Sequence, residues 1–267
     1  MGSSITPGGE SLHVDILPQP DDTTCGPTCL HAVYRYYGDI ISLTQVIKEV
    51  RKLKGGGTLA VFLACHALKH GYRAKIYTYN LHVFDPTWFV AGKPVADIAN
   101  RLRAQAKAKN ISKLKTATEG YLEFLSLGGE LRFEDLTTNL LRKYLKRSIP
   151  IISGLCSTYL YRDMREVGAE NRDDDIRGEP SGHFVVLCGY NKEERSVLLA
   201  DPYQLNPVSH SQYYSLSIDR VVCSILLGIL TYDANFLIIE PTRHKKQEKR
   251  NADSSCSQRP EGMAPGH

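Results

Sequence analysis

QPDDTTCGPTCLHAVYRYYG, residues 19–38, is the stretch around which the rest of the chain can be interpreted. It predicts an extended lead-in, a turn, and about three turns of amphipathic helix that begin near Cys25 and end at Gly38. Thr24 is a candidate cap for this helix, and Pro27 is tolerated in its first turn, where N–H groups have no partner within the helix. A thiol at a helix N-terminus lies in a positive potential that favours the thiolate, so Cys25 is a candidate nucleophile. A buried core cysteine is the alternative, and the stretch alone leaves both open.

The composition is that of an ordinary soluble globular protein, with 42% apolar and 23% charged residues in a chain of 267. From Pro241 onward six Lys or Arg residues stand against three acids, so most of the net charge of +4 lies in the C-terminal segment. The body of the chain lacks the basic field that nucleic acid requires, and no nucleic-acid partner is expected. We find no secretory signal and no apolar run long enough to span a bilayer. Seven cysteines, an odd number at irregular spacing, add to the expectation of a cytoplasmic protein with reduced thiols.

The order of the predicted elements is typical of an α+β fold, in which helices come first and a sheet comes late. A capping box at 42–45 and a second cap at Thr58 mark two helix starts, and a strand over 73–79 follows them. A strongly amphipathic pattern ends the helical region near Ser148. Short apolar runs rich in β-formers come next, at 150–155, 183–190, 196–200 and 236–240.

These elements predict one domain over residues 13–242, with a helical insertion at about 81–132. We expect a flexible N-terminus over 1–12 and a disordered basic tail over 243–267. The connector 156–181, between the first two late strands, is too long for a simple turn. Connections of this length are usually functional or disordered, and because this one is charged and carries tyrosines we expect it to act as a lid.

A cysteine nucleophile needs a base that takes its proton, a group that orients the base, and donors for the oxyanion. The run SGHFVVLCGY places His183 at the mouth of a buried strand, as a base should be. Asp201 follows the strand 196–200, and a hairpin through the turn NKEER would bring it beside His183 as the orienting carboxylate. Gln19, six residues before Cys25, offers an amide donor. Each has an ordinary alternative, as a core histidine, a turn aspartate or a surface glutamine, and the predicted hairpin favours the catalytic interpretation.

Together, the motifs Q-x5-C-G-P before a helix ending in YYG, GHFVVL, a G-Y-N turn and ADPY resemble the papain-like (clan CA) cysteine peptidases. They are most similar to the bacteriocin-processing, double-glycine leader peptidases and their stand-alone relatives. The resemblance covers roughly residues 13–80 and 133–240. It implies a papain-like α+β fold in which the helix bearing the cysteine packs on an antiparallel sheet that carries His and Asp. It also implies four roles: Cys25 as nucleophile, His183 as general base and then acid, Asp201 as orienter and Gln19 in the oxyanion hole.

The expected function is that of a cysteine peptidase or amidase that cleaves a peptide or isopeptide bond through a thioester at Cys25. Two alternatives stay open, an acyltransferase with the same triad and a catalytically silent module that binds peptides. The expected partner is a peptide or protein substrate, bound with the help of Gly182, Tyr159 and Tyr161. The sequence does not predict the oligomeric state.

Metal and redox chemistry are not predicted. Cys65, His66 and His70 share one predicted helix, with the two histidines in His-x3-His spacing. The glutamate of the metalloprotease motif is absent and no further ligand lies nearby in the sequence, so we expect no metal site and no cofactor. Cys25 and Cys29 are one residue too far apart for a thioredoxin-type motif, and we assign Cys29 to the helix core.

Overall fold

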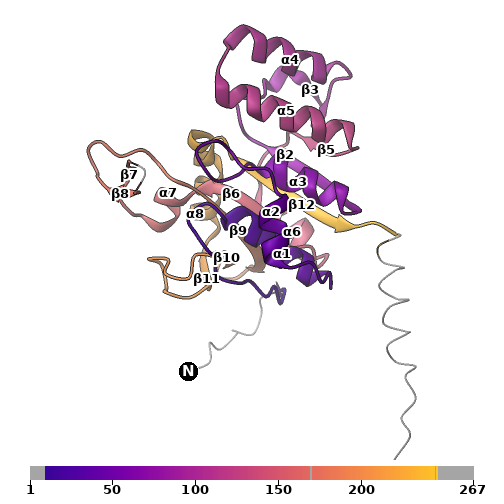
Figure 1. Cartoon of the computed structure of the whole chain (residues 1–267). Coiled ribbons are helices and arrows are strands. Elements are labelled where there is room, and N and C mark those ends of the chain that lie inside the picture. Colours follow the sequence, from indigo (N-terminus) through magenta and orange to yellow (C-terminus); the bar gives the residue numbers. More distant parts are fainter. Residues whose placement is uncertain (1–9, 169, 244, 246–267) are drawn as a thin grey trace, which may run out of the picture.

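One mixed sheet forms the centre of the molecule. The computed structural model describes residues 10–168, 170–243 and 245. The strands of the sheet are β1 (Glu10–Ser11), β2 (Tyr72–Thr78), β5 (Glu130–Arg132), β6 (Ile151–Cys156), β9 (Gly182–Asn191), β10 (Ser196–Ala200), β11 (Tyr213–Ser217) and β12 (Asn235–Pro241). Their order is β11-β10-β9-β6-β12-β2-β5, with β1 paired to β9 (Figure 1). Neighbouring strands are antiparallel except β2 and β5, which are parallel.

Helices cover both faces of this sheet. The helices on the first face are α1 (Cys25–Tyr36), α2 (Leu43–Glu49), α3 (Ala60–Lys69), α4 (Ile98–Lys109) and α5 (Ser112–Ser126). Those on the second face are α6 (Thr138–Leu145), α7 (Ser157–Tyr161) and α8 (Ile218–Leu227). The short 3-10 helix η2 (Gly228–Thr231) joins α8 to β12.

Strand β9 is buried on both sides because its side chains alternate between the two cores. Phe184 and Val186 belong to the core beneath α1, whereas Val185 and Leu187 belong to the core beneath α8. A strand covered on both faces reads as an unbroken apolar run, which explains GHFVVL in the sequence. The polar residue at its start, His183, therefore lies at the rim of the sheet, where the apolar run ends.

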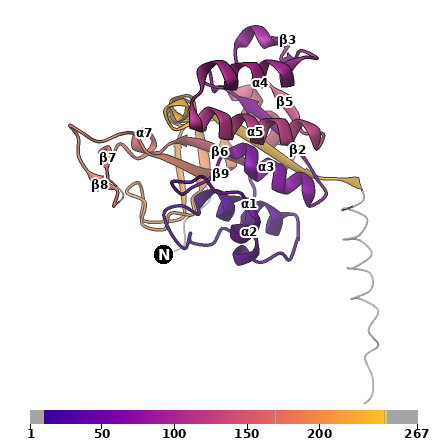
Figure 2. The ribbon, with the colours of Figure 1, turned by 45° about the horizontal axis from the view of Figure 1, so that its top comes forward.

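Residues 81–132, which are predicted to be a helical insertion, pack over α3 (Figure 2). They hold the 3-10 helix η1 (Pro86–Trp88), the small hairpin β3 (Phe89–Val90) and β4 (Lys93–Pro94), and then α4 and α5. Figure 2 shows α5 lying between α4 and α3, and the buried α5 residues join the same core as those of α3. This part of the chain is thus continuous with the core that carries α1.

The α+β fold and the hairpin of β9 and β10 are confirmed. The prediction that Thr58 caps the third helix is wrong. This helix begins at Ala60 and has Leu59, which offers no side-chain hydrogen bond, at its N-cap position. The carboxylate of Asp233 accepts the Ala60 N–H instead, at 2.9 Å. A residue remote in sequence therefore satisfies the first donor of α3.

The predictions for the two ends of the chain fall largely outside the described residues, which leave out 1–9 and 246–267. Within the described part, Glu10 and Ser11 pair with β9, and Lys245 Nζ lies 2.8 Å from Asp39 Oδ2. None of the helices over residues 10–168 and 170–243 is both long and apolar enough to cross a lipid bilayer.

Candidate active site

Cys25 is the first residue of α1 and lies where this helix meets the sheet. The approach is close: a Cβ atom at Gly26 would lie 2.6 Å from Thr58 Cγ2 and 3.2 Å from Phe184 Cδ2. One turn later the Cys29 thiol donates to the Phe184 carbonyl, at 3.3 Å. Burial, with the nearby charges of Cys25 and Asp201, raises the pKa of the Cys29 thiol well above its usual value. Cys29 is thus a core residue, as predicted, and glycine at 26 lets the helix start reach the sheet.

The start of α1 has no side-chain cap. Thr24 occupies the N-cap position, but its hydroxyl bonds to Asp21, accepting from the N–H at 3.2 Å and donating to the carbonyl at 2.9 Å. The predicted cap by Thr24 is therefore wrong. Among the residues described, none accepts the Cys25 N–H. This donor remains available at the positive end of the helix.

His183 and Asp201 lie side by side because β9 and β10 form a hairpin. His183 is the second residue of β9, Asp201 follows the last residue of β10, and Nε2 is 2.8 Å from Oδ1. Since a carboxylate only accepts, Nε2 carries the proton, and Nδ1 is left for Cys25. Burial alone would lower the pKa of His183, but the charges of Asp201 and Cys25, and hydrogen bonds to both, raise it to about 10. These surroundings favour the imidazolium form of His183.

The Asp201 carboxylate is fully buried and accepts four hydrogen bonds. Oδ1 accepts from His183 and, at 2.8 Å, from the Tyr203 N–H. Oδ2 accepts from the hydroxyls of Tyr161, at 2.7 Å, and Tyr214, at 2.5 Å. Burial opposes ionisation, but the charge of His183 and the hydrogen bonds from His183 and the two tyrosines hold the pKa of Asp201 below its usual value. With about four acceptor positions filled, the carboxylate is fixed in orientation and stays charged.

Gln19 lies on the lead-in to α1, at the edge of the same region. Its N–H donates to the Pro202 carbonyl at 2.9 Å, which ties the lead-in to the residue after Asp201. Its side-chain Nε2 donates to the Asp21 carbonyl at 3.0 Å. An amide nitrogen carries two protons, so one N–H of Gln19 stays free after this bond. Its Oε1 is buried and has no partner among the described residues.

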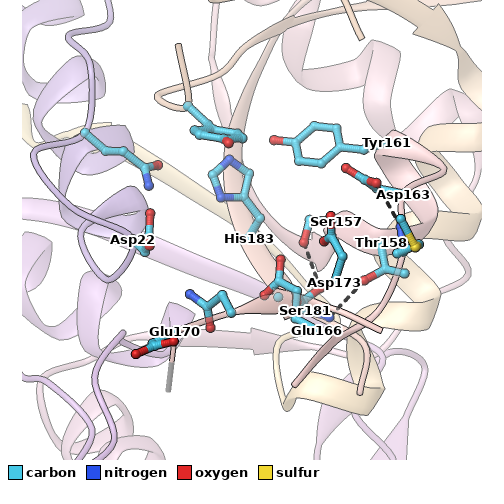
Figure 3. Close-up of a pocket in the computed structure, with 15 residues that line it drawn as sticks. Asp22, Ser157, Thr158, Tyr161, Asp163, Glu166, Glu170, Asp173, Ser181 and His183 are labelled. Carbon is cyan, nitrogen blue, oxygen red and sulfur yellow. Dashed lines mark hydrogen bonds between the residues drawn. The ribbon is translucent and has the colours of Figure 1, made fainter. Parts of the chain in front are cut away.

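A cavity of about 560 Å³ opens beside His183. It lies between the lead-in to α1 and the connector, which forms α7 and a small hairpin of β7 (Glu166–Val167) and β8 (Arg172–Asp173). Figure 3 shows His183 and Tyr161 facing this space, with acidic side chains around it. Its lining holds five carboxylates and no Lys or Arg: Asp22, Asp163, Glu166, Glu170 and Asp173.

Comparison with known proteins shows the family of this chain. Residues 11–219 match the model of the Peptidase_C39 like family. The chain belongs to this family. The prediction of a papain-like cysteine peptidase is confirmed at this level, while no curated protein matches the chain.

Solved structures similar to this peptidase include a C39-like peptidase from Bacillus anthracis, at 13% identity and a TM-score of 0.48, with 88% of this chain and 98% of that chain covered. Another is xylellain, a cysteine protease from Xylella fastidiosa, at 14% identity and a TM-score of 0.46, with 89% and 87% covered. A third is a double-glycine motif protease from an AMS/PCAT transporter in complex with its leader peptide, at 16% identity and a TM-score of 0.40, with 89% and 97% covered.

Of the three residues predicted to bind substrate, two line the cavity beside His183 and one does not. Gly182 lines the cavity, and Tyr161 lines it while bonding to Asp201. Tyr159 is 43% exposed and is not part of the lining. Tyr214 was not predicted as a partner of Asp201. The alternation of Tyr214 and Leu216 with Ser215 and Ser217 was the available signal for a strand with Tyr214 on its inner face, and the structure buries Tyr214 between exposed neighbours. The substrate-binding roles stay predictions.

Proposed function

We propose that this peptidase hydrolyses peptide or isopeptide amide bonds through a thioester at Cys25. The observation that carries the proposal is the fully bonded Asp201 carboxylate, which orients His183 and favours its charged form. A structural aspartate has no need of a histidine partner and two tyrosine donors at the rim of a cavity. Such an arrangement orients a base and keeps it charged.

The reaction begins when the Cys25 thiolate attacks the scissile carbonyl carbon and forms a tetrahedral oxyanion. As the C–N bond breaks, the His183 imidazolium gives its proton to the leaving amine, and the acyl group stays on sulfur as a thioester. Water then enters, gives a proton to His183 and attacks the thioester. Release of the carboxylic acid restores the thiolate and the imidazolium.

Two donors are available for the oxyanion. The Cys25 N–H has no acceptor within the described chain and points from the uncapped start of α1. The second N–H of the Gln19 amide is free, because only one is needed for the bond to Asp21. Donors already fixed before the reaction are worth about 10²–10³ in rate each.

The charge of the cavity suggests which substrates fit best. The lining holds five carboxylates and no Lys or Arg. Among the described residues, only Glu170 of these acids pairs with a Lys or Arg (Arg172, at 3.9 Å), so a basic peptide would meet largely uncompensated negative charge. We expect peptides with Lys or Arg close to the scissile bond to be preferred over acidic ones.

The proposed function is tested by competition between thiols. The protein is treated with a limiting amount of iodoacetamide at pH 6, and mass spectrometry measures the modification of each cysteine. Cys25 is expected to react first, ahead of the exposed Cys223, and to lose this advantage in a His183→Ala variant. Equal rates at Cys25 and Cys223 would contradict an activated nucleophile and favour the silent binding module.

A peptide library then separates hydrolysis from acyl transfer. With water as the only acceptor, the proposal predicts products that end in free carboxylates. If cleavage appears only when amine acceptors are added, and the products carry the amine, the acyltransferase is correct instead.

A further inference from the structure

A second cluster of imidazole and carboxylate groups lies on the helical side of the molecule, away from the catalytic cavity. His66 lies in α3, His70 is the C-cap residue one turn later, and Glu49 ends α2. Glu49 Oε2 lies 3.1 Å from His66 Nε2 and 3.0 Å from His70 Nε2. The two rings are stacked, with centroids 4.2 Å apart and planes at 12°. Three ligand atoms on two helices therefore converge, all within 4.8 Å of one another.

Neighbouring groups hold two of these side chains in place. The Tyr34 hydroxyl lies 2.9 Å from His66 Nδ1, which turns Nε2 toward Glu49. The Gln45 amide donates to Glu49 Oε1 at 2.8 Å, which leaves Oε2 facing the histidines. Metal-binding histidines and carboxylates are usually held in this way by hydrogen bonds on their far side.

The cations beside the cluster are already paired. A cavity of about 240 Å³ adjoins it, and Lys69 and Arg51 are part of its lining. Lys69 Nζ lies 2.6 Å from Glu123, and Arg51 Nη2 lies 2.6 Å from Glu119. Their charges are thus partly neutralised by acids outside the cluster, and the cavity leaves room for water on the cluster.

The two nitrogen–oxygen distances suit a small tetrahedral ion. Bonds of about 2.0–2.2 Å to nitrogen and oxygen place neighbouring ligand atoms roughly 3.4 Å apart. The two Nε2–Oε2 separations, 3.1 and 3.0 Å, come within a few tenths of an ångström of this value. A plain hydrogen-bond network would also bring one carboxylate oxygen to two imidazoles, so a test must distinguish the two.

We propose that Glu49, His66 and His70 form a Zn²⁺ site with three protein ligands and a fourth position open to water from the adjoining cavity. Two imidazoles and a carboxylate are a common zinc ligand set. The ion would join α2 to α3 and, through Tyr34, reach the last turns of α1. No residue that lines the 240 Å³ cavity also lines the 560 Å³ cavity beside His183, so the role of the ion would be structural. It would hold α2 and α3 together against α1, the helix that carries Cys25.

The test compares matched variants of the full chain in a Cys25→Ser background, which removes the catalytic thiol as a competing ligand. Each protein is freed of metal with a chelator and dialysed against micromolar Zn²⁺, and bound zinc is measured by atomic emission. Glu49→Gln and His70→Gln remove ligands. His82→Gln is the control, because His82 is an exposed histidine outside the cluster, stacked on Tyr232.

The parent and His82→Gln are expected to bind one equivalent more zinc than Glu49→Gln and His70→Gln. Tyr34→Phe keeps the ring and removes the hydroxyl, and it should weaken binding about tenfold without abolishing it. Zinc should also raise the melting temperature of the parent and of His82→Gln, but not that of Glu49→Gln or His70→Gln. Equal zinc content and equal melting shifts in the parent and His70→Gln would overturn the proposal and leave a hydrogen-bond network.

Discussion

The proposed catalytic pair, His183 and Asp201, and the Glu49 cluster are built from the same chemical groups, yet their surroundings give them opposite properties. Asp201 is fully buried and accepts four hydrogen bonds, and it serves a single imidazole. The Glu49 side chain is 37% exposed and is shared by two imidazoles. The pKa of His183 is raised, whereas burial and the neighbouring His70 lower that of His66 to about 4. In this protein, the buried carboxylate that serves one imidazole goes with a raised histidine pKa, whereas the half-exposed carboxylate shared by two imidazoles does not offset the burial of His66.

Asp233 shows what happens to a buried carboxylate that has no imidazole. It accepts from the Ala60 N–H, at 2.9 Å, and from the Asn235 amide, at 3.4 Å. Burial raises its pKa to about 7, against the hydrogen bonds and the distant charge of Lys113. Asp201 and Asp233 are similarly buried, so the difference between them comes from the cation and the hydroxyl donors around Asp201.

The largest expected effect comes from deleting His183, and deletion of His70 is the comparison. His183→Ala removes the proton carrier and should lower kcat/KM on a cleaved peptide by about 10²–10⁴-fold. His70→Ala should change it less than about twofold, because no residue of the Glu49 cluster lines the catalytic cavity. Steady-state kinetics on both variants, with circular dichroism to verify folding, decides. Comparable losses of activity in both would show that the two assemblies are coupled.

Substituting Asp233 tests the effect of burial without a cation. Its folded pKa of about 7 exceeds the ordinary value of 3.8, so the folded state binds more protons than the unfolded state between about pH 4 and 7. The stability that this group contributes is present below pH 4 and is lost as the pH rises through 7, by up to about 4 kcal/mol. Asp233→Asn keeps an acceptor for α3 and should make the protein more stable than the parent at pH 8 but not at pH 4.5. Urea unfolding at both pH values measures this difference. A constant difference between the two proteins would mean that Asp233 does not titrate in this range.

Contacts within one hairpin or one helix could be predicted from the sequence. His183 and Asp201 are 18 residues apart, and the apolar runs on either side of a polar turn were enough to predict their contact. The β9 run was visible because both of its faces are buried. Strand β11, by contrast, is buried on one face only, and neither it nor α8 was predicted.

Contacts between remote segments were beyond the reach of spacing arguments. Asp233 caps a helix that begins 173 residues earlier, so the sequence around Thr58 suggested the wrong cap. Glu49 lies 17 residues before His66, on another helix, and no pattern along one helix could supply it as a third ligand. Whether two helices meet depends on how their apolar faces pack, and the polar residues of a helix do not indicate which other helix it packs against.

Tyr161 provides a finer test of the catalytic pair. Tyr161→Phe removes one of the two hydroxyl donors to Asp201 Oδ2, and hydrogen bonds to charged groups contribute about 1.5–3 kcal/mol. The imidazolium is then held less firmly, so kcat should fall roughly tenfold and the pH profile should show a lower pKa for His183. Tyr159→Phe is the matched control on the same short helix, since Tyr159 is exposed and any effect there should fall on KM. A change in KM alone for Tyr161→Phe would assign Tyr161 to substrate binding rather than to Asp201.

The smallest expected effect concerns the acids of the catalytic cavity, which differ from Asp201 and Asp233 in being largely open to solvent. Asp163→Asn and Glu166→Gln together should raise KM several-fold for a peptide with Lys or Arg near the scissile bond and leave a neutral peptide unaffected, because exposed charge pairs contribute about 0.2–1 kcal/mol each. Glu193→Gln, in the exposed turn after β9, is the control. The difference should shrink in 1 M salt, where the screening length falls to about 3 Å from about 10 Å at 0.1 M. If the double variant binds the basic peptide as tightly as the parent at low salt, the carboxylates serve the solubility of the connector and not the choice of substrate.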